Sequence, residues 1–435
     1  MVKKITQRKF VKDSFWTVCS HVFVSVSGLV INSIIGLKYQ ADGLGIFVQS
    51  LSFYLLFTLL ANLGVQTSAQ KHASQYSTEN RKLRLIFTNS VVLTALISIT
   101  STSVIVLILN VFPHFLSSME VFYFLTNLCF AVPFFSINKT INNYLVGLRL
   151  LKYYSAVRIL RWSLILLGII FISSINESLN TIAYLFIFTE IVLFIMLIIR
   201  CKYYWTKPDL EWIGIHLKFG FKNIMAEFVS TINTHSPILI IGYISGNSAA
   251  GYFAYILFFA RTILLIPGAL QKNFNPLFTK YWYSNQIGLI KDKLYEVFKG
   301  CLFSMIPVFV TLYSFFLIYT KLFMPPDYLE LSFILFILLL GMSTTYLFGP
   351  FSTLLIMSGN LYSNFFRVTL IAITNFVFTI LFVSKFGYSG AAYAIIISLV
   401  LEILLLDIFY KRKLGIKLFK ITIFQIMGTI YKNNN

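Results

Sequence analysis

The stretch IIGYISGNSAAGYFAYILFFAR, residues 240–261, decides the fold because it repeats an earlier part of the chain. Residues 34–53 read IIGLKYQADGLGIFVQSLSF, and a constant shift of 206 residues aligns the two stretches without a gap. Two pairs of glycines align, Gly36 with Gly242 and Gly45 with Gly251. Matches among Ile, Leu and Phe carry little weight in so apolar a sequence, and composition bias is the alternative explanation. The glycines favour two halves of the same orientation.

The composition indicates an integral membrane protein. Hydrophobic residues make up 58% of the 435 residues and charged residues only 11%. Apolar runs of about 20 residues, the length that a helix needs to cross hydrocarbon, recur from end to end. A transmembrane barrel would show short alternating segments instead. The formal charge of +20 does not indicate nucleic acid, because the basic residues lie between apolar runs, where they set topology and face the inner leaflet.

The apolar runs predict an all-α protein of about 12 transmembrane helices, in two six-helix bundles related by a parallel repeat, with a central cavity between them. The predicted spans are 15–37, 43–64, 84–111, 120–146, 153–175, 181–200, 219–243, 250–273, 295–320, 329–357, 361–384 and 388–410. Five prolines inside these spans predict kinks: Pro133, Pro237, Pro267, Pro307 and Pro350. The predicted domains are residues 1–205, residues 206–410 and a cytoplasmic amphipathic tail, residues 411–435.

The basic residues predict the orientation. With the N-terminus inside, 27 of the 35 Lys and Arg residues lie in predicted inner segments or at the span ends beside them, and 3 lie in outer loops. Positive charge marks the cytoplasmic side, and one missed helix would invert every later loop. The sequence therefore predicts a multi-pass protein with both termini in the cytoplasm.

Motifs for enzyme chemistry are absent from the sequence. There is no GxxxxGK[ST] phosphate-binding loop, no HExxH and no serine elbow. The four cysteines are scattered without metal-ligand spacing, so neither a metal nor another cofactor is expected. The predicted outer loops are too short to hold the site of a membrane glycan polymerase. Transport by alternating access is the function class that remains, and no catalytic residue is expected.

Arg261 lies deep in a predicted span. It follows Gly251, which starts its helix at the outer face, by ten residues, and a rise of about 1.5 Å per residue places it about 15 Å deep, near the midplane. A guanidinium at that depth is costly and cannot easily reach water. It either faces the central cavity and binds an anionic group such as phosphate, or pairs with Glu190 or Glu227.

Arg158, Arg161 and Lys139 are further candidates for a cationic cavity. The two arginines are three residues apart and share a helix face. All three side chains are also near enough to the inner ends of their helices to reach the interface instead. Glu190 and Glu227 lie deep enough to act as counter-ions or to carry the coupling ion.

Three other charged residues in the spans are expected to be structural. Arg367 is shallow and is expected to extend to the interface. Glu402 and Asp407 precede Lys411, Arg412 and Lys413 on the last predicted helix, which predicts interfacial ion pairs with these basic residues.

Several motifs resemble those of one transporter family. They are residues 245–253 (SGNSAAGYF) followed by Arg261 and by residues 275–278 (NPLF), residues 43–47 (GLGIF) followed by 62–64 (NLG), residues 348–350 (FGP) followed by 358–360 (SGN), and residues 386–393 (FGYSGAAY). Together they resemble the polysaccharide flippase branch, the Wzx type, of the MATE-like MOP exporter superfamily. The resemblance extends over nearly the whole chain.

The resemblance implies a transporter of the bacterial inner membrane. Such a flippase would move an undecaprenyl-diphosphate-linked oligosaccharide, an O-antigen or capsule repeat unit, to the periplasmic leaflet. It implies a cationic central cavity, a coupling ion that is either proton or sodium, and a partnership with polysaccharide polymerase machinery. The alternative is a MATE-type cation or drug exporter, but residues 14–37 contain no Asp or Glu to bind a coupling ion as many exporters do. A peptidoglycan-precursor flippase would usually have 14 helices.

Overall fold

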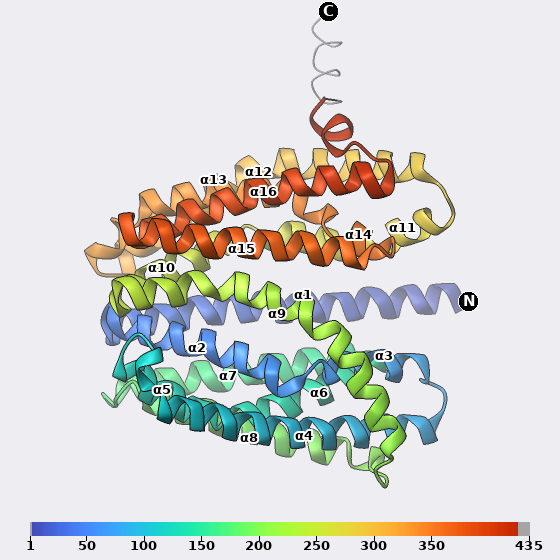
Figure 1. The fold of residues 1–435 in the computed structure, drawn as a ribbon, viewed down its shortest axis with the longest axis horizontal. Coiled ribbons are helices and arrows are strands. Elements are labelled where there is room, and N and C mark those ends of the chain that lie inside the picture. Colours follow the sequence, from blue (N-terminus) through green and yellow to red (C-terminus); the bar gives the residue numbers. More distant parts are fainter. Residues whose placement is uncertain (1, 425–435) are drawn as a thin grey trace, which may run out of the picture. The chain divides into compact units, whose positions relative to one another are not determined.

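The computed structural model describes the backbone of residues 2–424, and the side chains of residues 16–422 except those at 222, 223, 226, 272, 273 and 276. Within this range all regular structure is helical and no strand occurs (Figure 1). The predicted all-α class is therefore confirmed.

The helices before residue 205 follow the predicted apolar runs. They are α1 (Val2–Lys38), α2 (Gln40–Asn62), α3 (Val65–Gln75), α4 (Asn80–Val111), α5 (Met119–Cys129), α6 (Val132–Gly147), α7 (Leu151–Ser174) and α8 (Thr181–Arg200). Helix α3 lies in a segment that the sequence places between two spans. Its composition is polar, which suits a short helix at the membrane surface.

The later helices also follow the predicted runs. They are α9 (Leu210–Ser245), α10 (Asn247–Thr262), α11 (Leu265–Tyr283), α12 (Ile287–Phe323), α13 (Ser332–Phe348), α14 (Leu354–Met357), α15 (Leu361–Phe386) and α16 (Tyr388–Leu414). Short 3₁₀ turns connect several of them, and a π-helical turn, Lys420–Phe424, follows α16.

The described residues contain nine helical segments long and apolar enough to cross a membrane, or up to 11 if two bent helix pairs each form one span. Each of these 11 overlaps one predicted span. The remaining predicted span, 219–243, lies on α9, three of whose side chains are outside the described set. The multi-pass character is confirmed, and the count of 12 stays a prediction.

Both bent pairs lie where a proline predicts a kink. Helices α5 and α6 meet at 51°, with Pro133 in the first turn of α6. Helix α10 and the start of α11 meet at 46°, close to Pro267. Proline has no backbone N–H to donate to the carbonyl of the preceding turn, so the helical hydrogen-bond pattern is interrupted at these points.

By contacts, the chain divides into two compact units. Unit 1 comprises residues 1–231 and 246–251, and unit 2 comprises residues 232–245 and 252–435. The division falls inside α9, whereas the predicted halves meet between residues 205 and 206. The six-plus-six arrangement, the boundaries of the halves and the cavity between them stay predictions.

The segment that joins α8 to α9 is bonded to α4. The hydroxyl of Thr88 donates to the Tyr204 carbonyl at 3.3 Å and accepts the Thr206 N–H at 2.9 Å. The side-chain carbonyl of Asn89 accepts the Asp209 N–H at 2.8 Å. These bonds satisfy backbone groups of the connection, and they hold the start of α9 in unit 1.

The aligned glycines lie in close backbone contact. A Cβ added to Gly45 would lie 1.8 Å from the Asn247 carbonyl oxygen, and a Cβ added to Gly251 would lie 2.0 Å from the Ala41 carbonyl oxygen. The 206-residue shift also relates Ala41 to Asn247, so the contact is reciprocal. A local two-fold relation produces such reciprocity. It supports the alignment, and the repeat as a whole stays a prediction.

Substitution of Gly251 by alanine is expected to destabilise the protein by about 1–3 kcal/mol, because two backbones must separate to admit the methyl group. The matched control is Gly300→Ala in α12, where nothing lies within 4 Å of the added Cβ. Removing a helical glycine there should be neutral or stabilise by about 0.5–1 kcal/mol. Thermal unfolding of the purified proteins measures the stability of both variants. Equal melting temperatures for Gly251→Ala and Gly300→Ala would contradict the close backbone contact at Gly251.

The start of the predicted tail packs within unit 2. Gly415 takes a left-handed conformation that ends α16, and the side chains of Ile416 and Leu418 are buried. Asp407 accepts the Phe419 N–H at 3.1 Å. Among the described residues Asp407 forms no ion pair, so its predicted pairing with residues 411–413 is wrong. The last part of the predicted tail, residues 425–435, lies outside the described residues.

Candidate functional site

Arg161 and Glu190 form a buried ion pair between α7 and α8. Arg161 Nε lies 2.6 Å from Glu190 Oε1, and Nη2 donates to Oε2 at 2.9 Å. Asn138 on α6 donates to the same Oε2 at 2.8 Å, and the guanidinium lies over the Phe135 ring at 4.8 Å. Glu190 is only 1% exposed. Two close contacts to one guanidinium and a third donor hold the carboxylate in place, so it is poorly placed to exchange an ion.

Lys139 and Glu227 form a looser pair between α6 and the first part of α9. Lys139 Nζ lies 3.4 Å from Glu227 Oε1, and Gln66 on α3 donates to Oε2 at 3.4 Å. The two side chains remain 26% and 36% exposed. Long, partly exposed contacts are weak, so this pair can open and rehydrate far more readily than the Arg161–Glu190 pair.

Arg158 contacts a histidine rather than an acid. Its Nη1 lies 3.0 Å from both ring nitrogens of His21 on α1. An imidazole accepts an arginine N–H only through a ring nitrogen that carries a lone pair, and it brings no negative charge to the contact. Such a contact leaves the positive charge of the guanidinium uncompensated.

Arg261 lies in unit 2 beside a proline-interrupted part of α9. Pro237 has no N–H for the carbonyl of Asn233, and Asn375 on α15 donates to that carbonyl at 3.2 Å. One residue further along, the Thr234 carbonyl accepts Arg261 Nη2 at 2.8 Å. The guanidinium is thereby oriented by a neutral backbone acceptor. No described acidic residue of unit 2 forms an ion pair with it.

Arg367 is buried in unit 2 and paired. It is 3% exposed, and its Nη1 donates to Glu402 at 2.9 Å while Nη2 donates to Asn364 at 3.1 Å. The predicted extension of Arg367 to the interface is therefore wrong, because a neighbouring helix supplies a carboxylate. The predicted pairing of Glu402 with residues 411–413 is wrong for the same reason.

The predicted site residues therefore fall into separate groups. Glu190 and Glu227, proposed from the sequence as partners of Arg261, are each paired inside unit 1 with another cation. The sequence reasoning missed the amides that complete these groups: Gln66, Asn138, Asn364 and Asn375. For Asn138, Asn364 and Asn375 the available signal was an amide inside an apolar run, because a polar group in hydrocarbon needs a partner.

A comparison with protein families matches residues 40–332 to the family described as "Polysaccharide biosynthesis protein". The chain belongs to this family. The matched range extends from the start of α2 to the start of α13 and includes five of the candidate charged residues in one stretch of sequence, from Lys139 to Glu227, together with Arg261. The comparison with curated proteins gives no match.

Solved structures with the same fold are membrane transporters. A MATE-family multidrug resistance transporter of the MOP superfamily, in an inward-facing conformation, is 13% identical over 88% of this chain and 92% of its own, with a TM-score of 0.74. The lipid II flippase MurJ, in an inward closed conformation, is 18% identical over 97% and 93%, with a TM-score of 0.73. A MOP-superfamily transporter from Pyrococcus furiosus is 14% identical over 92% and 96%, with a TM-score of 0.56. The chain therefore combines membership of a polysaccharide biosynthesis family with the fold of these transporters.

Proposed function

We propose that this protein is a flippase that moves an undecaprenyl-diphosphate-linked oligosaccharide repeat unit across the bacterial inner membrane by ion-coupled alternating access. Both termini then lie in the cytoplasm. The proposal is supported by membership of a polysaccharide biosynthesis family combined with the fold of a membrane transporter. The lipid-linked glycan is its substrate, and polysaccharide polymerase machinery would take the product.

The proposal depends mainly on the groups that Arg158 and Arg261 contact. Among the described residues, these are the intramembrane guanidiniums that contact a histidine or a backbone carbonyl instead of a carboxylate. A diphosphate must lose water to enter the membrane, and uncompensated cations offset that cost by charge-assisted hydrogen bonds. Arg161 and Lys139, also candidates for a cationic cavity, have their charges matched by Glu190 and Glu227. We therefore assign them a weaker role in binding.

Glu227 is the better candidate for ion coupling. A coupling group must lose its partner during each cycle, and the Lys139–Glu227 contact is long and partly exposed. Glu190 would have to break a short two-pronged pair in a buried place. Either a proton or sodium suits a carboxylate released in this way.

A MATE-type cation or drug exporter is the second candidate, because an exporter of that family shares the fold. A cation exporter needs an acid free to meet its substrate. Glu190, Glu227, Glu402 and Asp407 each have a cationic or N–H partner. Glu120 and Glu330 lie at the ends of their predicted spans, where they are exposed. The charge pattern therefore favours an anionic substrate.

Deletion of the gene is expected to leave surface polysaccharide absent and lipid-linked repeat units accumulating on the cytoplasmic leaflet. The lipid-linked units are made normally in this case, and only their translocation stops. Extraction of the lipid-linked glycans and staining of the surface glycan measure the two quantities. Normal surface glycan together with increased sensitivity to cationic drugs would instead identify an exporter.

A further inference from the structure

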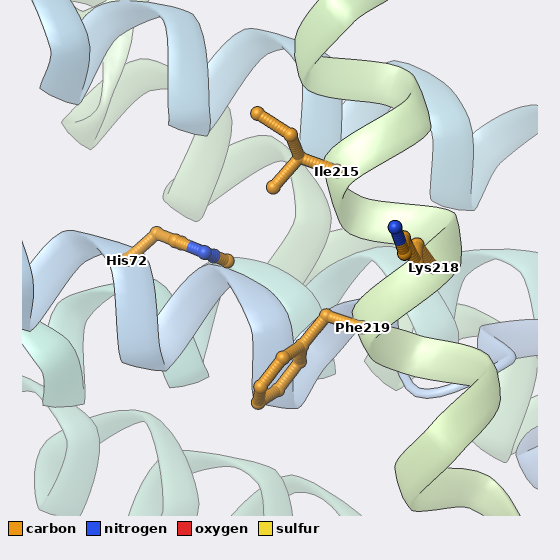
Figure 2. Close-up of a pocket in the computed structure, with 4 residues that line it drawn as sticks. All are labelled: His72, Ile215, Lys218 and Phe219. Carbon is orange, nitrogen blue, oxygen red and sulfur yellow. The ribbon is translucent and has the colours of Figure 1, made fainter.

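A pocket of about 250 Å³ lies in unit 1 between α3 and the first part of α9. Its lining residues are His72 from α3 and Ile215, Lys218 and Phe219 from α9. Figure 2 shows the His72 side chain extending from α3 toward α9, with Ile215 and Phe219 extending toward α3 on either side of it. The pocket lies outside the predicted spans or at their ends, close to the C-terminal end of α2, where Gly64 contacts Gly220.

A hydrogen-bond network fixes the imidazole of His72. Its Nδ1 lies 2.9 Å from the Ser68 carbonyl, which can only accept, so Nδ1 carries the proton. The Ser68 hydroxyl lies 2.8 Å from Nδ1 of the buried His216. Burial, with a smaller effect of the Lys71 charge, lowers the pKa of His72, and the ring is neutral at physiological pH. The neutral ring has its lone pair on Nε2, which therefore accepts a hydrogen bond.

The rest of the pocket lining combines a lysine with two apolar side chains. Lys218 supplies an exposed ammonium group, and a second ammonium, of Lys71, lies over the Phe219 ring at 4.2 Å. Ile215 and Phe219 supply apolar surface. Trp212 packs edge-on against His72 at 5.8 Å, and Tyr76 packs against Trp212 at 5.9 Å. Aromatic rings and lysines in this combination are typical of the level of lipid headgroups.

We propose that this pocket binds the headgroup of an amphiphile that carries a phosphate ester beside a free hydroxyl. Lys218 contacts the phosphate, His72 Nε2 accepts the hydrogen bond of the hydroxyl, and Ile215 and Phe219 contact the first apolar carbons. Lys71 adds positive charge at the rim. Both a phospholipid with a glycerol headgroup and a polyprenyl-diphosphate sugar carry this chemistry. The inference concerns binding at the inner surface and does not depend on the proposed transport.

Binding to the delipidated full-length protein can be measured by native mass spectrometry with three probes: phosphatidylglycerol, phosphatidylethanol, which keeps the phosphate but lacks the hydroxyl, and a short polyprenyl-diphosphate monosaccharide. Wild-type protein is expected to bind phosphatidylglycerol or the polyprenyl compound about threefold to tenfold more tightly than phosphatidylethanol. Lys218→Gln should weaken binding of each bound probe about tenfold. Lys291→Gln, an exposed lysine on α12, is the matched control and should change nothing.

The probes distinguish the two sources of the headgroup. If phosphatidylglycerol binds and the binding depends on Lys218, the proposal is supported and the occupant is a bulk phospholipid. If only the polyprenyl compound binds in this way, the proposal is supported and the occupant is the lipid-linked glycan. His72→Phe should remove the preference for probes that carry a hydroxyl. If this variant does not fold, the comparison of the three probes in wild-type protein still tests the role of the hydroxyl. Equal binding of all probes by wild-type and Lys218→Gln protein would overturn the proposal.

Discussion

Replacement of Arg261 by glutamine is expected to reduce glycan transport by about tenfold to a hundredfold while the protein still accumulates in the membrane. Glutamine keeps an N–H that can donate to the Thr234 carbonyl, the contact that Arg261 makes, but it removes the positive charge. Charge-assisted hydrogen bonds contribute about 1.5–3 kcal/mol each, which sets the size of the expected loss. Surface glycan in a complemented deletion strain is the measurement, with protein level determined in the same cells.

Two further substitutions separate charge from structure at this position. Arg261→Lys keeps the charge without the two-pronged geometry and should retain partial transport, and Arg261→Ala should lose most of it. Arg412→Gln, at an exposed position of α16, is the matched control and should transport normally. If Arg261→Gln transports like the wild type, the role of Arg261 is limited to holding the Thr234 carbonyl beside Pro237, and the phosphate-binding role is wrong.

Substitution of Arg161 by methionine is expected to destabilise the protein by about 3–5 kcal/mol, the largest stability effect that we predict. The change leaves the Glu190 carboxylate, 1% exposed, without its cation. Removing one partner of a buried ion pair costs far more than the pair contributes, because the remaining charge stays desolvated. The loss should appear as a lower melting temperature of purified protein and a lower amount in the membrane.

A second change should restore stability. In the double variant Arg161→Met with Glu190→Gln no charge remains, and Asn138 keeps an acceptor, so most of the loss should be recovered. The comparison within the same protein is Lys139→Met, which removes the cation from the partly exposed Glu227 and should cost at most about 1 kcal/mol. A similar loss from Lys139→Met and Arg161→Met would show that burial does not set the cost.

The helices were predictable because the membrane imposes a simple requirement on the sequence. A helix must be apolar over about 20 residues to cross hydrocarbon, and this requirement marks its position without knowledge of its neighbours. The bends near Pro133 and Pro267 were predictable for a similarly local reason, the missing N–H of proline.

The partners of the charged residues were not predictable from the same information. Sequence gives the depth of Glu190 along its helix but not the helix that faces it, and Arg161 supplies the cation that was expected from Arg261. The burial of Arg367 was misjudged because its position near the end of a predicted span suggested contact with water. Instead, Glu402 on the adjacent helix accepts a hydrogen bond from the guanidinium. Choosing between such partners requires the rotation and packing of helices, which depend on contacts distant in sequence.

The His72–His216 network was missed for another reason. The two histidines are 144 positions apart in segments that lie between or beside predicted spans, and neither belongs to a recognisable motif. Ser68 joins them only because α3 folds as a helix along the first part of α9. Aromatic residues near both histidines, Tyr76 and Trp212, were the available indication that these segments meet at the membrane surface.

The hydrogen bonds from Thr88 and Asn89 to the connection before α9 affect how the protein could be split into two separately expressed fragments. A chain cut between residues 205 and 206 would give an N-terminal fragment without the part of α9 that belongs to unit 1. A cut after residue 231 would interrupt a continuous helix, and a cut after residue 251 would leave residues 232–245 on the wrong fragment. The two units alternate along the sequence, so no single cut yields two self-contained polypeptides.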